Sequence, residues 1–273
     1  MSVRYGVIGN PIEHSKSPLI HAAFAAQSGD EIDYRRILGT AEGFEREVAD
    51  FFRQGGGGLN VTVPFKERAW RLADRLGASA ELAQAVNTLI PAADGGLRGE
   101  NTDGIGLVRD LVVNHGCHLN GSRILLLGAG GASKGVAPAL LEQGPLSLTI
   151  ANRTAAKAED LAARLASLGL VRGCGLDALG DERFDLIING TSAGLSDQLP
   201  ALPPKLLEPG GWSYDLMYAS EATAFVRWGR AQGADQSLDG LGMLVEQAAE
   251  SFFLWRGIRP ETAPVIAMLS GSR

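Results

Sequence analysis

The segment that most constrains the fold is a glycine-rich turn between an apolar run and a helical pattern. The apolar run Ile124–Leu127 is typical of a buried strand, and Gly128-Ala129-Gly130-Gly131-Ala132-Ser133 follows it directly. A helical pattern then covers Gly135–Leu141. A strand, a glycine turn and a helix in this order predict a dinucleotide site, in which the backbone approaches a pyrophosphate at the helix N-terminus. Ser133 stands where Gly or Ala is usual, so an ordinary strand-to-helix turn is the alternative.

A second segment indicates which dinucleotide would bind. Asn152-Arg153-Thr154 follows the strand pattern Leu148–Ile150, roughly twenty residues after the glycine turn. An NAD site usually has Asp or Glu here for the ribose hydroxyl, whereas this chain has Arg153, with Lys157 one helical turn later. Two cations in place of one acid predict a 2′-phosphate and therefore NADP, unless both are ordinary solvated charges.

Composition limits the other classes of function. The chain has 273 residues, which suggests about two domains, and a net charge of −6, which leaves no general basic field for nucleic acid or an anionic membrane. Cys117 and Cys174 have no metal-site spacing, the four histidines form no ligand pattern, and no signal peptide or membrane span is visible. We expect a cytoplasmic protein with no metal, no nucleic-acid partner and no membrane partner.

The alternation of short apolar runs with helical patterns predicts an α/β fold with largely parallel sheets. The expected strands are 5–8, 33–38, 59–63, 86–90 and 96–99 in the first part, and 123–127, 147–151, 184–188 and 212–215 in the second. We expect a substrate-binding domain over 1–103, completed by C-terminal helices in 240–273, and a Rossmann-type NADP domain over 104–239. A cleft is expected between the two domains, with ligands at the carboxyl ends of the strands.

Polar side chains follow the strands expected in the first domain. Ser15 and Ser17 flank a helix start, where two hydroxyls and free N–H groups could hold a carboxylate, although plain helix capping would explain them equally. Asn60 and Thr62 end the third strand, and Lys66 follows closely. A lone lysine is usually a solvated charge, so Lys66 alone does not indicate catalysis.

A carboxylate changes that interpretation of Lys66. Asn87 begins the next strand, and Asp103 follows Asn101 and Thr102 at the expected domain boundary. Asp103 could simply be the N-cap of the following helix. If Asp103 and Lys66 face one cleft, however, they could share a proton and bind a substrate hydroxyl, which is an acid–base arrangement.

These segments resemble a known family over about residues 3–270. The motifs GNPIEHSKSP, NVTVPFKE, AVNT, GENTDG, GAGGAS, NRT, NGTSAG and DGLGMLVEQAA occur in the order seen in the shikimate dehydrogenase family. Most of them are not general dinucleotide-site motifs, so the resemblance is specific. It implies NADP-dependent, reversible reduction of 3-dehydroshikimate to shikimate, on the route to chorismate and the aromatic amino acids, by a monomer or homodimer.

The resemblance also implies a role for each matching residue. Lys66 and Asp103 match the catalytic pair. The substrate-binding positions are Ser15, Ser17, Asn60, Thr62, Asn87, Tyr218 and Gln247. The cofactor-binding positions are Gly128, Ala129, Gly130, Gly131, Ala132, Ser133, Asn152, Arg153, Thr154, Lys157, Leu216 and Gly240. In the family, Lys157 often is arginine and Leu216 more commonly methionine; a lysine at 157 keeps the charge but lacks the planar fork of arginine.

Three alternatives stay open at this point. A paralogue that oxidises quinate or an amino-substituted relative would have the same fold and residues. A non-catalytic NADP-sensing protein is possible, although retention of Lys66 and Asp103 speaks against it. A folate-pathway dehydrogenase has a similar two-domain design, which the Ser15 and Ser17 carboxylate site disfavours.

Overall fold

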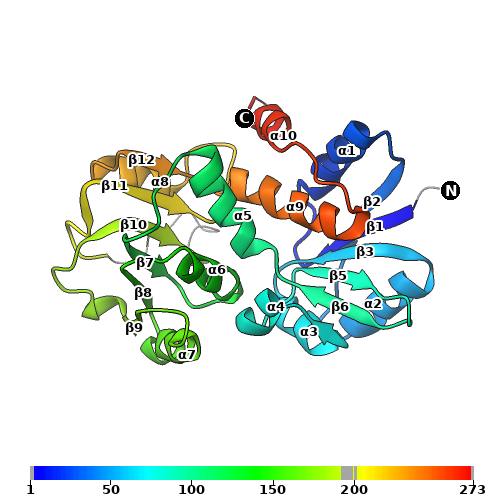
Figure 1. The fold of residues 1–273 in the computed structure, drawn as a ribbon, viewed down its shortest axis with the longest axis horizontal. Coiled ribbons are helices and arrows are strands. Elements are labelled where there is room, and N and C mark those ends of the chain that lie inside the picture. The colour runs from blue at the N-terminus through cyan, green and yellow to red at the C-terminus, as the bar shows by residue number, and fades with distance from the viewer. Residues whose placement is uncertain (1–2, 192–198, 200–201, 272–273) are drawn as a thin grey trace. The chain divides into compact units, whose positions relative to one another are not determined.

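The computed structural model describes residues 3–191, 199 and 202–271, and it divides into two compact units (Figure 1). The first unit comprises Met1–Gly106 and Leu244–Ser272, and the second comprises Leu107–Met243. The end of the NGTSAG motif, residues 192–194, lies outside the described residues. Within the described part of the chain, every helix is too short or too polar to cross a membrane.

The first unit is built on a mixed six-stranded sheet with the order β2-β1-β3-β5-β6-β4. Its strands are β1 (Val3–Gly9), β2 (Ile32–Leu38), β3 (Gly56–Val61), β4 (Arg75–Leu76), β5 (Thr88–Pro91) and β6 (Leu97–Glu100). Its helices are α1 (Ser17–Ser28), α2 (Phe44–Arg53), α3 (Lys66–Leu72), α4 (Ala78–Ala83) and α10 (Ala263–Ser270), together with most of α5 (Asp103–Arg109) and α9 (Leu241–Arg256), which both continue across the division into the second unit. The pairs β3–β5 and β5–β6 are antiparallel and the others are parallel, which confirms a mostly parallel sheet.

Apolar spacing explains how α2 covers this sheet. Phe44, Val48 and Phe51 recur at helical intervals and are buried, while the acidic residues of α2 face away. The ring of Phe44 stacks on Phe65 with the ring centroids 4.7 Å apart. Because Phe65 directly precedes α3, this packing fixes where that helix begins and therefore where Lys66 stands.

The second unit has a fully parallel six-stranded sheet in the order β12-β11-β10-β7-β8-β9. Its strands are β7 (Arg123–Leu127), β8 (Ser147–Asn152), β9 (Val171–Gly175), β10 (Phe184–Asn189), β11 (Leu207–Asp215) and β12 (Gln236–Leu238). Its helices are α6 (Gly131–Glu142), α7 (Ala155–Leu165) and α8 (Ala224–Ala231). This order is that of dinucleotide-binding sheets, and the strand order reverses between β7 and β10, where such sheets bind ligands. The predicted Rossmann-type fold is confirmed.

Several short elements differ from the sequence expectation. Strands β4, β9 and β12 were not predicted, because they are short and carry few apolar residues. The segment that begins at Asp103 is α-helical to Arg109 and continues as a π-helical segment, Asp110–Asn114.

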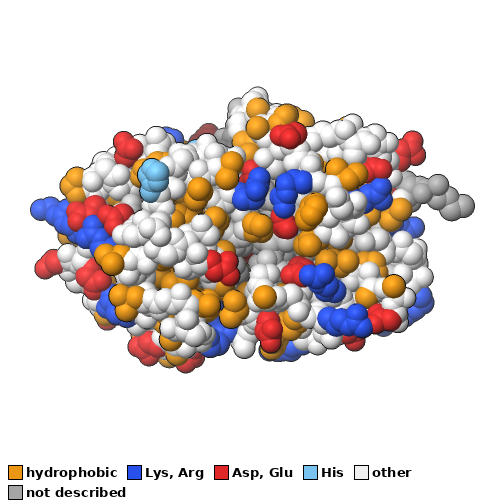
Figure 2. Space-filling model, in the orientation of Figure 1, with side chains coloured by type: hydrophobic (Ala, Val, Ile, Leu, Met, Phe, Trp, Pro, Cys, Tyr) orange, Lys and Arg blue, Asp and Glu red, His pale blue; other side chains and the backbone are white. Residues whose placement is uncertain are grey.

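The surface agrees with the modest net charge. On the face drawn in Figure 2, acidic and basic side chains are interspersed rather than gathered into one broad basic area.

Candidate active site

Lys66 and Asp103 form a largely buried ion pair in the first unit. Lys66 is the first residue of α3 and Asp103 the first of α5, and their Nζ and Oδ2 atoms lie 2.5 Å apart. Their side chains are only 15% and 7% exposed. The other carboxylate oxygen of Asp103 accepts a hydrogen bond of 2.8 Å from the amide of Asn87. The Asp103 carboxylate is therefore engaged by Lys66 and Asn87, a different use from the N-cap alternative.

A network of buried polar groups supports this pair. The amide of Asn87 also donates to Thr102 at 2.9 Å and to Gln247 at 3.4 Å. The amide of Asn60 donates to the Asn87 carbonyl oxygen at 3.1 Å. It also donates to the hydroxyls of Thr88 and Ser251, while its own oxygen accepts a bond of 2.7 Å from Tyr34. Predicted residues Asn60, Asn87, Gln247, Lys66 and Asp103 are thus brought together.

Ser15 and Ser17 stand at the start of α1, beside the end of β3. Their hydroxyls lie 3.1 Å apart, and α1 has Lys16 as its N-cap with no side-chain capping bond. The Ser15 hydroxyl accepts a weak bond from the Ser17 N–H at 3.3 Å. The Ser15 hydroxyl thus bonds the first N–H of α1, so local capping accounts for part of what this hydroxyl does. The N-terminus of α1 carries the positive end of the helix dipole, which is the setting predicted for an anion.

Thr62 follows β3 and lies next to the segment that follows β1. That segment, residues 10–17, contains Ser15 and Ser17 and is called the serine loop. A side chain on Gly9 would place its Cβ 2.3 Å from the Thr62 methyl group, so only glycine fits there. The Asn10 N–H donates to the Val63 carbonyl oxygen at 3.0 Å, which ties the segments after β1 and β3 together. The carboxyl ends of β1 and β3 thus present Ser15, Ser17 and Thr62 at one edge of the sheet.

Several residues of this network were not predicted from the sequence. Thr88, Thr102 and Ser251 join the network, Tyr34 bonds Asn60, and Arg36 donates from Nε and Nη2 to the Ser15 carbonyl oxygen at 2.9 and 2.6 Å. Ser251 was detectable, since it lies four residues after Gln247 and so on the same face of α9. Tyr34 and Arg36 carried no local signal, because only sheet pairing brings β2 to this edge.

The glycine turn of the second unit lies where the strand order reverses. Gly128 has φ +97°, and a Cβ there would lie 3.0 Å from the Gly190 carbonyl oxygen, so β7 and β10 meet at this point. Space is open around Gly130 and Gly131, and α6 begins with no side-chain cap. Ser133 is buried, and its hydroxyl has no hydrogen-bond partner within the described residues. Free N–H groups below open space fit a pyrophosphate.

The basic segment follows β8 and surrounds the start of α7. The amide of Asn152 donates to the Thr154 carbonyl oxygen at 2.9 Å, and Thr154 is the N-cap of α7. Arg153 and Lys157 are exposed, and the first turn of α7 contains no acidic residue. A lysine in the first turn opposes the helix dipole, so this pair of cations fits a bound anion better than it fits helix stability.

The remaining predicted residues follow β11 and β12. Leu216 and Tyr218 are half-buried, and a Cβ on Gly240 would lie 2.4 Å from the Leu216 carbonyl oxygen, so Gly240 is required by close approach. Asp215 holds this segment: its carboxylate accepts bonds from Asn189 at 3.0 Å, the Met217 N–H at 3.1 Å and Thr223 at 2.6 Å. Burial raises the pKa of the Asp215 carboxyl, and those bonds oppose the shift.

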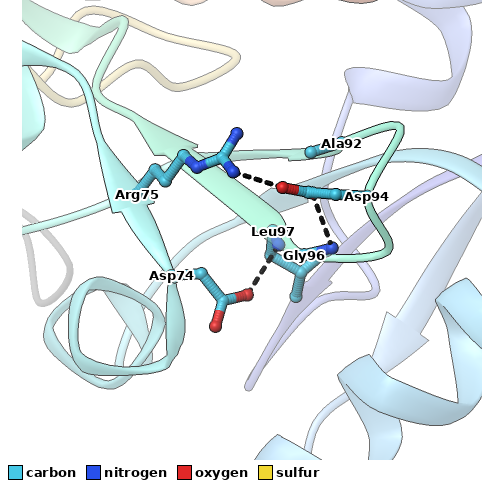
Figure 3. Close-up of a pocket in the computed structure, with 6 residues that line it drawn as sticks. All are labelled: Asp74, Arg75, Ala92, Asp94, Gly96 and Leu97. Carbon is cyan, nitrogen blue, oxygen red and sulfur yellow. Dashed lines mark hydrogen bonds and ion pairs between the residues drawn. The ribbon is translucent and has the colours of Figure 1, made fainter.

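Other candidate sites are weaker. A surface pocket of about 240 Å³ lies at the β5–β6 hairpin (Figure 3). Asp94 pairs with Arg75, and Asp74 accepts a hydrogen bond from the Leu97 N–H. The carboxylates of this pocket therefore stabilise the hairpin. Among the residues that the structure describes, no three His, Cys, Asp or Glu side chains are grouped to hold a metal. Burial raises the pKa of the Cys117 thiol to about 11 and also raises that of Cys174, so both are poor nucleophiles.

Three family models match successive parts of the chain. Residues 7–89 match the shikimate dehydrogenase substrate binding domain. Residues 110–195 match shikimate / quinate 5-dehydrogenase, and residues 240–267 match the shikimate 5'-dehydrogenase C-terminal domain.

Individual relatives match over nearly the full length. The shikimate dehydrogenase (NADP(+)) of Alkalilimnicola ehrlichii is 59% identical over 269 residues, covering 98% of this chain and 99% of the relative. The crystal structure of an Ael1 enzyme from Pseudomonas putida is 47% identical with a TM-score of 0.91, covering 98% of both chains. The Thermus thermophilus shikimate 5-dehydrogenase, solved with NADP(H) and shikimate, is 32% identical with a TM-score of 0.88, covering 99% of this chain and 100% of that one.

Proposed function

The chain belongs to the shikimate dehydrogenase family, and on that premise we propose that it reversibly reduces 3-dehydroshikimate to shikimate with NADPH. The family resemblance noted in the sequence is confirmed, and so are the oxidoreductase class and the NADP cofactor. The reaction belongs to the pathway that leads through chorismate to the aromatic amino acids. We further propose a cytoplasmic enzyme that acts as a monomer or homodimer.

The observation that carries this proposal is the buried pair of Lys66 and Asp103. Reduction at carbon 3 of the ring creates an alkoxide, which needs a proton, and oxidation returns that proton. The Lys66 ammonium donates it in reduction, and the amine accepts it in oxidation. Asp103 binds the same hydroxyl and orients the lysine, while the Asn87 amide holds the second oxygen of Asp103. Bound NADPH supplies the hydride for carbon 3.

The other polar residues orient the ring. Ser15, Ser17 and Thr62 hold the substrate carboxylate with neutral hydroxyl donors. Asn60, Asn87 and Gln247 offer amides to the ring hydroxyls, and Tyr218 is a further contact. The Asn60 side-chain NH₂ group already donates hydrogen bonds within the protein, to Asn87, Thr88 and Ser251. We therefore propose that Asn60 acts mainly by holding Asn87 in place.

The cofactor is held by residues of the second unit. The N–H groups at the start of α6, in Gly130–Ser133, bind the pyrophosphate, and Gly128 with Ala129 makes the turn that exposes them. Asn152, Arg153, Thr154 and Lys157 take the adenosine phosphate. Leu216 and Gly240 flank the nicotinamide, and the Asp215 carboxylate fixes the segment that carries Leu216.

A spectrophotometric assay tests the proposal. The purified chain is mixed with shikimate and NADP⁺, and NADPH formation is followed by absorbance; the assay is repeated with NAD⁺ and with quinate. We expect a kcat/KM that is highest for shikimate with NADP⁺. Preference for quinate would show the quinate-oxidising paralogue instead. A chain that binds NADPH but turns over neither acid would be a sensing protein.

Arg153→Ala tests the choice of cofactor. Charge-assisted contacts contribute about 1.5–3 kcal/mol, so we expect the KM for NADPH to rise about 10- to 100-fold, with the KM for NADH changed by less than about twofold. Initial rates with each cofactor at saturating substrate measure both constants. Arg172→Ala is the control. Arg172 lies on β9 and pairs with Glu182, and its removal should leave both constants unchanged. Equal effects of Arg153→Ala on the two cofactors would contradict a 2′-phosphate contact.

A further inference from the structure

The side chains predicted to bind the carboxylate are uncharged hydroxyls, and Lys16 lies between the two serines as the N-cap of α1. Ser15, Ser17 and Thr62 are neutral, and a carboxylate held only by neutral donors forms weaker hydrogen bonds than one near a cation. Among the described residues, Arg36 is the cation found in direct hydrogen-bond contact with this loop.

Arg36 is attached to the serine loop through its backbone. Its Nε and Nη2 atoms donate to the Ser15 carbonyl oxygen at 2.9 and 2.6 Å, so two of its five N–H groups are used. The remaining three have no hydrogen bond or ion pair with a described residue. The guanidinium is exposed, so it is neither neutralised by a partner nor buried for a structural purpose.

The neighbouring arginine provides a contrast on the same strand. Arg35 and Arg36 are adjacent in β2 and therefore point to opposite faces of the sheet. Arg35 pairs with Asp33 at 2.7 Å, which is an ordinary surface ion pair. Arg36 instead turns toward Ser15, next to the N-terminus of α1, where the helix dipole adds further positive potential.

From this arrangement we propose that Arg36 is a substrate-binding determinant whose charge strengthens the binding of an anionic substrate at the Ser15–Ser17 site. The inference rests on the proposed function, because it takes the substrate carboxylate to bind there. The guanidinium contributes through space and positions Ser15 at the same time. Since it is exposed, its field is screened by salt, which makes its contribution dependent on ionic strength.

The test is the KM for shikimate at saturating NADP⁺ in Arg36→Gln, Arg36→Lys and the control Arg35→Gln. In 20 mM salt we expect Arg36→Gln to raise the KM about five- to tenfold with kcat within about twofold, and Arg36→Lys to restore most of the loss. At 0.5 M salt the difference between Arg36→Gln and the parent chain should shrink to less than about twofold. Arg35→Gln should match the parent chain at both salt concentrations.

Two results would overturn the role of the charge. One is an unchanged KM in Arg36→Gln at low salt. The other is an increase that persists undiminished at 0.5 M salt, or that Arg36→Lys fails to reverse, because either outcome means that only the shape of the loop has changed. Thermal melting of each variant confirms folding. If the parent chain does not oxidise shikimate, the proposed function fails; if it does and Arg36→Gln behaves as the parent, only this inference fails.

Discussion

Lys66→Met should lower kcat about 10²- to 10⁴-fold, the usual contribution of a positioned general acid–base group, while the KM for shikimate changes by only a few-fold. Methionine keeps the length of the side chain but cannot donate or accept the proton at carbon 3. The Asn87 amide still holds Asp103 in place, so the ring hydroxyls keep most of their contacts. Steady-state kinetics in both reaction directions separate the two constants.

The loss of a buried charge partner must be separated from the loss of chemistry. Removing Lys66 leaves the 7% exposed Asp103 side chain without its cation, which destabilises a folded protein even where no reaction is involved. Thermal melts therefore accompany the kinetics, with Arg71→Met, on the exposed side of the same helix, as the matched control. An unchanged kcat would remove Lys66 from the chemistry. A loss in KM alone would make it a binding residue.

The parts of the fold that could be predicted from the sequence are those with a local cause. The glycine turn after β7 was recognisable because Gly128 needs a positive φ and the flanking strand and helix have clear patterns. Strand β9 was missed because its place depends on α7: a Cβ on Gly173 would lie 2.3 Å from the Ala158 backbone. Tertiary packing, and not strand propensity, decides that element.

The residues of the candidate site likewise divide into those that could be predicted from the sequence and those that could not. Lys66 and Asp103 could be singled out as polar residues after strands, but their 2.5 Å contact needs α3 and α5 to begin at neighbouring points. Thr88 and Asn60 are partners in the β3–β5 register, and such a pairing leaves no trace in the spacing along the chain. Arg36 reaches Ser15 only because β2 lies beside β1. The residues proposed for the chemistry could be selected from the sequence, whereas partners supplied by sheet pairing, such as Tyr34 and Arg36, could not.

His21 should make the first unit sensitive to acid. The ring is fully buried in α1 among aromatic side chains, stacked on Tyr34 with the centroids 4.2 Å apart and flanked by Phe24, Phe252 and Trp255. Neither ring nitrogen has a hydrogen-bond partner within the described residues. Burial lowers the pKa of His21 from 6.5 to about 3. The imidazole is therefore neutral in the folded chain, and Tyr34 is the other titratable side chain stacked against it.

The sign of the pH effect follows from that depressed pKa. Between pH 6.5 and about 3 the unfolded chain takes up a proton at this residue that the folded chain does not. The free energy of unfolding therefore falls as the pH falls through this range, by about 1.4 kcal/mol per pH unit. From pH 7 to pH 5 the contribution of His21 amounts to a loss of about 2 kcal/mol, a roughly 30-fold change in the unfolding equilibrium.

His21→Phe should abolish this part of the acid sensitivity, because a phenyl ring fills the aromatic cluster and takes up no proton. Urea unfolding at pH 7 and pH 5 measures it, with hydrogen exchange of the α1 amides assigning the change to the first unit. Between these pH values the free energy of unfolding should fall by about 2 kcal/mol less in His21→Phe than in the parent chain. His118→Gln, at an exposed histidine, controls for ordinary titration and should behave as the parent. Equal losses in His21→Phe and the parent would mean that the buried imidazole is already accessible to protons.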